Sequence, residues 1–88
     1  MQFRWNDWNI DHVGKHGVRL DEAESVVRQA KKPYPQKRED EKWLVWGRRS
    51  GGRLLQVIFL LDDDDTVYVI HARPLTKREK RRYHRRRK

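Results

Sequence analysis

Three apolar stretches separated by turn signals constrain the fold of this chain more than any other feature. Gly51-Gly52 suits a hairpin turn that needs positive φ, and the run Asp62–Asp65 marks a second turn. The three stretches span residues 43–49, 54–61 and 66–73. Each is rich in β-branched or aromatic side chains and has the length of a strand. The sequence therefore predicts an antiparallel sheet of three main strands.

Two helices are predicted before the sheet, after a short N-terminal strand at residues 2–5. Asn6 or Asp7 can cap the first helix, and Gly17 is a suitable residue to end it. Asp21 can cap the second helix, whose apolar residues recur at helical spacing and form one stripe. That stripe comprises Ala23, Val26, Val27 and Ala30. Prolines stop this helix, and the charged segment 31–42 is predicted to be a loop.

The C-terminal end is predicted to be a basic helix. Thr76 and Glu79 have the spacing of a capping box. Residues 76–88 carry nine Lys and Arg against one acid, whereas the other 75 residues carry 13 basic and 12 acidic side chains. Like charges along a helix oppose its persistence, so we expect one domain over residues 1–83 and a basic, disordered tail at residues 84–88.

The composition excludes several classes of protein. The chain has 88 residues and no Cys, which excludes disulfides, thiolate catalysis and Cys-based metal sites. No apolar run approaches the ~20 residues that cross a bilayer, and the N-terminus lacks the apolar region of a signal peptide. We therefore expect a cytoplasmic α+β protein that does not bind membranes.

The strand register can be predicted if both hairpin loops hold an even number of residues. Side chains then alternate so that one face of the sheet is apolar and is covered by the helices. This core face would comprise Leu44, Trp46, Leu55, Val57, Phe59, Tyr68, Ile70 and Ala72. The opposite face would have a cationic corner made of Arg49, Gln56, His71 and Arg73. A slip of one residue would invert this assignment.

The predicted corner contains the residue types that RNA cleavage needs. Two guanidinium groups can hold one phosphate and stabilise the charge that develops on it. An imidazole moves protons near neutral pH, and the RNA itself supplies the 2′-hydroxyl nucleophile. Simple binding of RNA or protein by the open face, or ordinary surface residues, would explain the same pattern. His12 and His16 have metal-ligand spacing, but no third ligand is evident, so no metal or cofactor is predicted.

Several segments, taken in order, are similar to the BrnT toxins. The similarity begins with Trp5 and residues 9–18, continues through residues 22–26, and includes Gly47-Arg48, residues 52–57 and residues 69–76. It covers most of residues 3–83. The matching positions that carry polar or charged groups are His12, Lys15, His16, Glu24, Arg48, Arg53, Arg73, Glu79 and Tyr83. His71 departs from the pattern, which often has a small hydroxyl residue at that position.

The resemblance implies a RelE-like fold and the toxin of a bacterial type II toxin–antitoxin pair. Such a toxin would be a metal-independent endoribonuclease without a cofactor. Its expected partners are RNA and a BrnA-like ribbon-helix-helix antitoxin, and it would contact operator DNA only through that antitoxin. A non-catalytic module that binds nucleic acid or the antitoxin is the alternative.

Site residues are predicted in two groups. The expected catalytic residues are Arg48, Arg73, His71 and His16. The expected RNA-binding residues are Arg49, Gln56, Arg53, Lys77, Arg78, Arg81 and Tyr83. The resemblance favours Arg48 as the partner of Arg73 in holding the phosphate, whereas the predicted register favours Arg49, and the sequence leaves this choice open.

Overall fold

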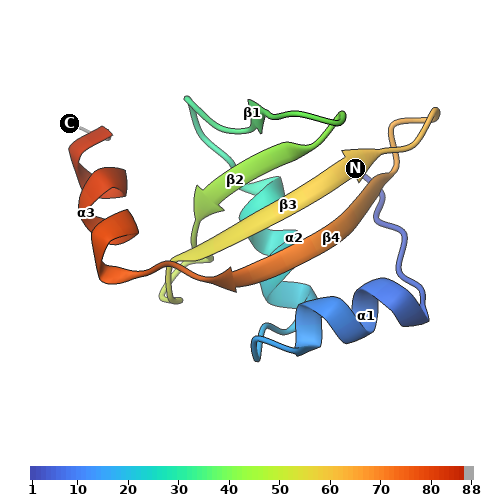
Figure 1. Ribbon diagram of the computed structural model, residues 1–88, viewed down its shortest axis with the longest axis horizontal. Coiled ribbons are helices and arrows are strands. Elements are labelled where there is room, and N and C mark those ends of the chain that lie inside the picture. Colours follow the sequence, from blue (N-terminus) through green and yellow to red (C-terminus); the bar gives the residue numbers. More distant parts are fainter. Residues whose placement is uncertain (87–88) are drawn as a thin grey trace.

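The computed structural model describes residues 1–86 and has three helices and a four-stranded antiparallel sheet. In chain order the elements are α1 (Asp7–Gly14), α2 (Leu20–Arg28), β1 (Gln36–Lys37), β2 (Trp43–Gly47), β3 (Leu55–Leu61), β4 (Val67–Pro74) and α3 (Lys77–Arg86). The strands lie in the order β1-β2-β3-β4, and α2 lies behind the sheet in Figure 1. Helix α1 runs beside β4, and α3 stands at the opposite end of the sheet from the β3–β4 turn. The predicted α+β class is confirmed.

The first helix begins at a capping box formed by Asn6 and Asn9. Asn6 Oδ1 accepts a hydrogen bond from the Asn9 backbone N–H at 3.1 Å, and Asn9 Oδ1 accepts one from the Asn6 N–H at 2.7 Å. Asn9 is fully buried and also donates from Nδ2 to the Arg4 carbonyl at 3.0 Å. Asn6 is therefore the cap, as predicted, but the helix ends at Gly14 rather than at Gly17.

The second helix confirms the predicted apolar stripe but begins before Asp21. Arg19 occupies the N-cap position, and its N–H donates to the carboxylate of Glu22 at 3.0 Å. Ala23, Val26 and Val27 are buried against the sheet. Periodic apolar residues thus predicted the buried face of α2 correctly, although Ala30, the last residue of the predicted stripe, lies beyond the end of α2 at Arg28.

The strand register differs from the prediction because both connecting loops hold an odd number of residues. Gly47 pairs with Leu55, and Leu61 pairs with Val67. In addition, the register shifts by one residue between Ile58 and Phe59. The residues predicted for the core face were therefore correct in β3. In β2 and in the first half of β4, the residues predicted for the core face lie on the opposite face of the sheet. Because the bulge shifts the register of β4 by one residue, Ala72 lies on the core face, as predicted.

The face of the sheet that packs against the helices carries small and branched apolar side chains. Val45, Val57 and Ala72 are paired across three strands and are fully buried. A Cβ built on Gly47 would lie 3.7 Å from Cγ1 of Val26, which places α2 on this face. We call the opposite side the outer face; its residues include Leu44, Trp46, Gln56, Ile58, His71 and Arg73.

Two further differences from the prediction concern the ends of the sheet. The predicted loop 31–42 contains the two-residue strand β1, which pairs with Trp43 and Leu44. The predicted N-terminal strand is reduced to an isolated parallel bridge between Phe3 and Val67. The Asp62–Asp65 turn is confirmed, and Arg4 holds it through an ion pair with Asp62 at 2.9 Å.

The last helix begins at the predicted capping box and extends further than predicted. Glu79 accepts from the Thr76 N–H at 2.9 Å, and Thr76 Oγ1 accepts from the Glu79 N–H at 3.1 Å. Helix α3 continues to Arg86, so residues 84–86 are helical rather than part of a tail. The rest of the predicted tail, residues 87–88, lies outside the described residues. Tyr83 turns toward the sheet and is buried.

Candidate functional site

A row of three side chains crosses the outer face from β2 to β4. Trp46 pairs with Gln56, and Gln56 pairs with Arg73. The indole N–H of Trp46 donates to Gln56 Oε1 at 3.0 Å, and an Arg73 Nη2 also donates to that oxygen at 3.4 Å. Gln56 is only 8% exposed, so its amide orients the guanidinium rather than projecting into solvent. The structure thus brings together two predicted site residues, Gln56 and Arg73, on adjacent strands.

Arg73 is held by Glu79 from helix α3. Its Nη1 and Nη2 atoms donate to the two carboxylate oxygens of Glu79 at 2.7 and 2.8 Å. This paired geometry lowers the pKa of Glu79 to about 2 and raises that of Arg73. The Arg73 side chain is 27% exposed. The ion pair therefore fixes the start of α3 beside β4 and leaves Arg73 partly open to solvent.

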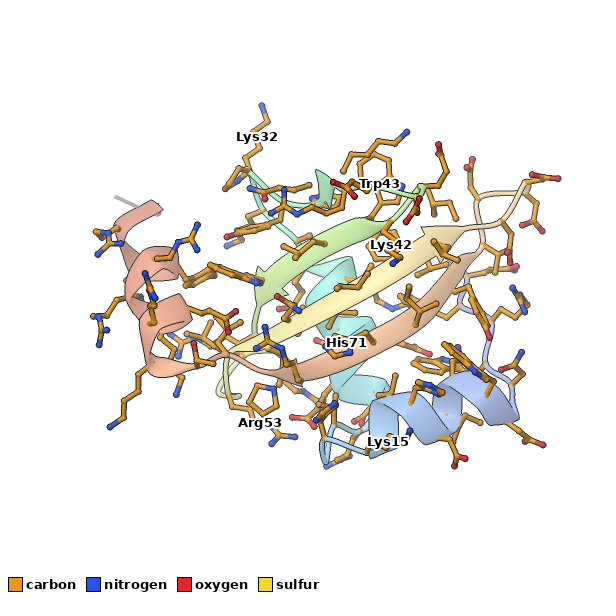
Figure 2. The ribbon with its side chains drawn as sticks, viewed as in Figure 1. Lys15, Lys32, Lys42, Trp43, Arg53 and His71 are labelled. Carbon is orange, nitrogen blue, oxygen red and sulfur yellow. The ribbon has the colours of Figure 1, made fainter. Side chains whose placement is uncertain are left out.

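Two histidines lie next to this row. His71 stands two residues before Arg73 on the same face of β4, and Figure 2 shows it on the side of the sheet away from α2. The ring centroid of His16, in the turn after α1, is 5.5 Å from that of His71. Burial lowers the pKa of His71, and the nearby charges of His16, Arg73 and His12 act in the same direction. The neutral form of the His71 imidazole is thereby favoured.

His12 does not join His16 in a metal site. Its ring stacks on Trp8 with centroids 3.8 Å apart, and its Nδ1 lies 2.9 Å from the Trp8 carbonyl oxygen. Among residues 1–86, no group of three or more His, Cys, Asp or Glu side chains is placed to hold a metal ion. His12 therefore has a packing role on α1.

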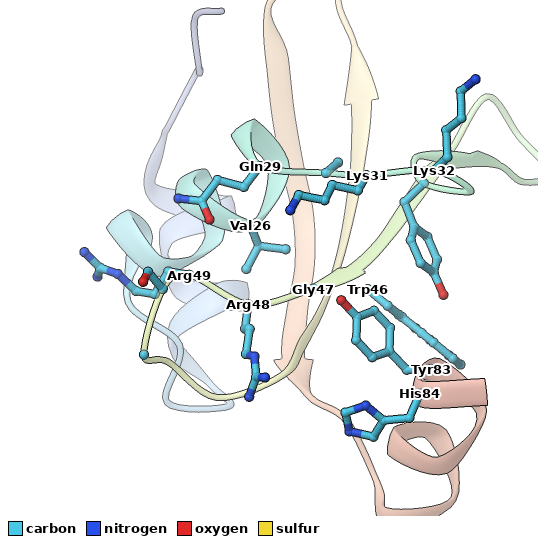
Figure 3. A pocket seen from close by; sticks show the side chains of 14 residues that line it. Val26, Gln29, Lys31, Lys32, Trp46, Gly47, Arg48, Arg49, Tyr83 and His84 are labelled. Carbon is cyan, nitrogen blue, oxygen red and sulfur yellow. The ribbon is translucent and has the colours of Figure 1, made fainter. Parts of the chain in front are cut away.

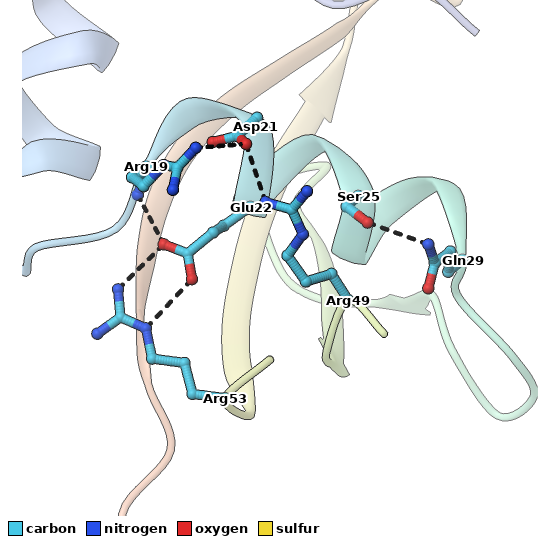
Figure 4. A network of polar contacts seen from close by, with 7 residues as sticks. All are labelled: Arg19, Asp21, Glu22, Ser25, Gln29, Arg49 and Arg53. Atoms are coloured by element: carbon cyan, nitrogen blue, oxygen red, sulfur yellow. Dashed lines mark hydrogen bonds and ion pairs between the residues drawn. The ribbon is translucent and has the colours of Figure 1, made fainter. Parts of the chain in front are cut away.

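The predicted pairing of Arg49 with Arg73 is wrong. Arg49 lies in the β2–β3 loop, and its Nη1 donates to Asp21 at 2.8 Å (Figure 4). Because the register is shifted, Gln56 and not Leu54 lies opposite Arg73 on β3. Asp21 also binds Arg19, and these cations lower its pKa, the hydrogen bond from Arg49 acting most strongly. Arg49 thus ties the loop to the start of α2.

Arg53 belongs to the same polar network (Figure 4). It donates to Glu22 at 3.1 and 3.3 Å and to the carbonyl oxygen of Gly17 at 2.6 Å. The hydrogen bond from Arg53 is the main reason that the pKa of Glu22 is lowered. Arg53 thus links the β2–β3 loop to the turn after α1 and to the first turn of α2.

A cavity of about 770 Å³ lies at the other end of the row, beyond Trp46 (Figure 3). It gathers the predicted residues Arg48, Arg49 and Tyr83 with three residues that sequence reasoning did not select, Lys31, Lys32 and His84. Tyr83 is only 6% exposed and packs 6.2 Å from Tyr34, ring centroid to ring centroid. Sequence reasoning had left open whether Tyr83 stacks a base or packs on the sheet, and the structure shows it packed.

The remaining predicted residues lie at the borders of the outer face. Lys77, Arg78 and Arg81 are exposed on α3, and Lys15 is exposed after α1. Sequence reasoning missed Trp46, which it had assigned to the core face. The signal that identifies Trp46 is its pairing with Gln56, and this pairing depends on the register. The side chains that meet around the outer face are His16, His71, Arg73, Gln56, Trp46 and Glu79.

Comparison of the chain with protein-family models, with curated proteins and with solved structures gave no match. No helix in residues 1–86 has the length and apolar character to span a membrane. The fold and the outer face thus define a small α+β domain in which His71 of β4 and His16 of the turn after α1 lie beside a positioned arginine.

Replacing Glu79 by Gln should reduce stability in a pH-dependent way. The folded protein depresses the pKa of Glu79 from 4.5 to about 2, so the ion pair stabilises the fold above pH 4.5 and loses its effect as the pH falls toward 2. We expect the free energy of unfolding of Glu79→Gln to be about 2 kcal/mol lower than that of the unmodified chain at pH 7, and equal to it below pH 2. Urea unfolding followed by Trp fluorescence at several pH values measures this.

Glu41→Gln is the matched control for this experiment. Glu41 also forms an ion pair, with Lys37 at 3.4 Å, but its side chain is 84% exposed. Exposed ion pairs contribute little to the free energy of unfolding, so this variant should be as stable as the unmodified chain at every pH. If the free energy of unfolding of Glu79→Gln were lower than that of the unmodified chain by the same amount from pH 7 to pH 2, the assigned role of the Arg73–Glu79 pair would be contradicted.

Proposed function

We propose that this protein is a metal-independent endoribonuclease that acts on single-stranded RNA at the outer face of its sheet. The observation that carries the proposal is the His16–His71 pair, with ring centroids 5.5 Å apart, next to the partly exposed guanidinium of Arg73. Imidazoles can act as base and acid, and a guanidinium beside them can bind the phosphate. The reaction needs no nucleophile from the protein, because the RNA carries one.

The proposed reaction is an internal transfer at phosphorus. Neutral His71 takes the proton of the 2′-hydroxyl while that oxygen attacks the adjacent phosphorus. The bond from phosphorus to the 5′-oxygen breaks, and His16 in its protonated form gives that oxygen a proton. The products are a 2′,3′-cyclic phosphate and a 5′-hydroxyl end. The lowered pKa of His71 suits it to act as the base.

Arg73 would stabilise the negative charge that builds up on the phosphate oxygens in the transition state. Gln56 and Glu79 hold its guanidinium in place from two sides. A bound phosphate would compete with Glu79 for the same N–H groups, or share them. Arg48 is the better candidate for a second phosphate-binding cation, because Arg49 is occupied by Asp21 whereas Arg48 is exposed and forms no ion pair with any described residue.

The biological role that we propose is that of a RelE-like toxin neutralised by a BrnA-like antitoxin in the bacterial cytoplasm. Two observations support it: the ordered similarity to the BrnT toxins and a fold in which a basic helix borders the outer face of an antiparallel sheet. Exposed Lys77, Arg78 and Arg81 on that helix would attract the RNA backbone. An antitoxin that covers this surface would block access of RNA to the site.

A cleavage assay tests the proposed activity. Purified protein should cleave single-stranded RNA in EDTA, without ribosomes, and should leave 2′,3′-cyclic phosphate ends. DNA of the same sequence is the matched control and should remain intact, since it lacks the 2′-hydroxyl. Expression of the chain alone should also arrest growth. Binding of RNA without any cleavage, together with normal growth, would instead support the alternative, a non-catalytic binding module.

A further inference from the structure

The cavity beyond Trp46 lies at an unpaired edge of the sheet. Strand β1 pairs only with Trp43 and Leu44 among the residues of β2. No described strand pairs with the rest of β2, residues 45–47, on the side where β1 lies. The end of α2, the segment that follows it, the β2–β3 loop and helix α3 surround this edge, and together they enclose a cavity of about 770 Å³ (Figure 3). Small-molecule sites in proteins have volumes in this range.

The charge of the cavity lining has a single sign. Lys31, Lys32, Arg48 and Arg49 line it, and none of its described lining residues is Asp or Glu. Arg49 is neutralised by Asp21, but Lys31, Lys32 and Arg48 form no ion pair with a residue that the structure describes. A concave surface with cations on several sides and no anion concentrates negatively charged ligands. The chemistry of the lining therefore favours a phosphate group.

Trp46 connects the cavity to the proposed cleavage site. One part of its ring lines the cavity, and its indole N–H donates to Gln56, which in turn binds Arg73. The guanidinium of Arg82 lies 5.8 Å from the centre of the Trp46 ring. A chain that lies across Gln56 and Arg73 on the outer face would therefore reach the cavity by passing Trp46.

We propose that this cavity binds a nucleotide of single-stranded RNA that is next to the cleaved bond. Lys31, Lys32 and Arg48 bind the phosphates that flank it, and the part of Trp46 that lines the cavity contacts the sugar or base. This inference rests on the proposed function, because the direction from Arg73 past Trp46 matters only if RNA lies on the outer face. An acidic peptide would satisfy the same charges, but the continuity through Trp46 favours the RNA chain.

Equilibrium binding to an RNA that cannot be cleaved tests the cavity separately from catalysis. The probe is a fluorescent single-stranded RNA with 2′-O-methyl groups throughout, measured by anisotropy at several salt concentrations. The double variant Lys31→Ala/Arg48→Ala should bind about tenfold more weakly. The slope of log K against log salt should fall by about 1.4, the value for two lost phosphate contacts to a single strand.

The matched control removes two cations from outside the cavity. Arg19 and Lys37 are exposed and pair with Asp21 and Glu41. Arg19→Ala/Lys37→Ala should keep the affinity and the salt slope of the unmodified chain. Equal losses in both double variants, or none in Lys31→Ala/Arg48→Ala, would overturn the inference. So would a poly-glutamate peptide that binds the unmodified chain more tightly than Lys31→Ala/Arg48→Ala while the RNA probe binds both proteins equally.

The two proposals fail in distinguishable ways. If unmodified RNA is cleaved and Lys31→Ala raises KM at unchanged kcat, both are supported. If the RNA is never cleaved but the 2′-O-methyl probe binds through the cavity, only the proposed function is lost. If Arg73→Ala abolishes cleavage while cavity substitutions alter neither RNA binding nor KM, only the proposed nucleotide site in the cavity is contradicted.

Discussion

Arg73→Ala is expected to lower the rate of RNA cleavage at least tenfold. The guanidinium is the cation that Gln56 and Glu79 position on the outer face, beside the His16–His71 pair. Charge develops on the phosphate oxygens in the transition state, so removal of the positioned cation raises the barrier. A loss of about 1.4 kcal/mol of transition-state stabilisation already gives a tenfold effect. Single-turnover cleavage of a labelled RNA in EDTA measures it.

Arg73→Lys separates the charge of this residue from its geometry. Lysine keeps the positive charge but cannot form the two parallel hydrogen bonds that Arg73 makes with Glu79. We expect Arg73→Lys to cleave faster than Arg73→Ala but more slowly than the unmodified chain. Melting curves of each variant separate a loss of fold from a loss of chemistry. Cleavage at the unmodified rate by folded Arg73→Ala would remove Arg73 from the mechanism.

Leu55→Ala is expected to lower the free energy of unfolding by about 3 kcal/mol. Leu55 is 1% exposed and lies on the face of β3 that packs against the helices, between Gly47 and Pro74 of the neighbouring strands. Truncation of a buried Leu removes its transfer free energy and leaves a cavity. This is a large part of the 5–15 kcal/mol that stabilises a small domain. Chemical unfolding followed by Trp fluorescence measures the loss.

Leu61→Ala is the matched control, since it makes the same chemical change in the same strand. Leu61 stands at the end of β3, and 42% of it is exposed. Leu61→Ala should lower the free energy of unfolding by less than about 1 kcal/mol, because 42% of the residue is already in contact with water. Equal losses for the two variants would contradict the position of the core on the helix-covered face.

The sequence by itself determined the features that depend on local spacing. The stripe of Ala23, Val26 and Val27 predicted the buried face of α2, and Thr76 with Glu79 predicted the start of α3. Turn signals predicted where the three main strands are separated. These features depend on interactions between residues three or four positions apart, which a linear pattern records directly.

The sequence correctly predicted that Gln56, His71 and Arg73 share one face, but only the tertiary structure decided which residues are paired there and that Trp46 joins them. The register depends on whether each loop holds an odd or even number of residues and on the bulge at Ile58, and neither is visible as a local pattern. A shift of one residue brought Gln56 opposite Arg73 and turned Trp46 to the outer face. Arg49 is not part of the predicted site. Its guanidinium instead donates to the carboxylate of Asp21, which is distant in sequence, at 2.8 Å. The pairing of charges between distant segments depends on three-dimensional proximity, and the fold alone fixes that.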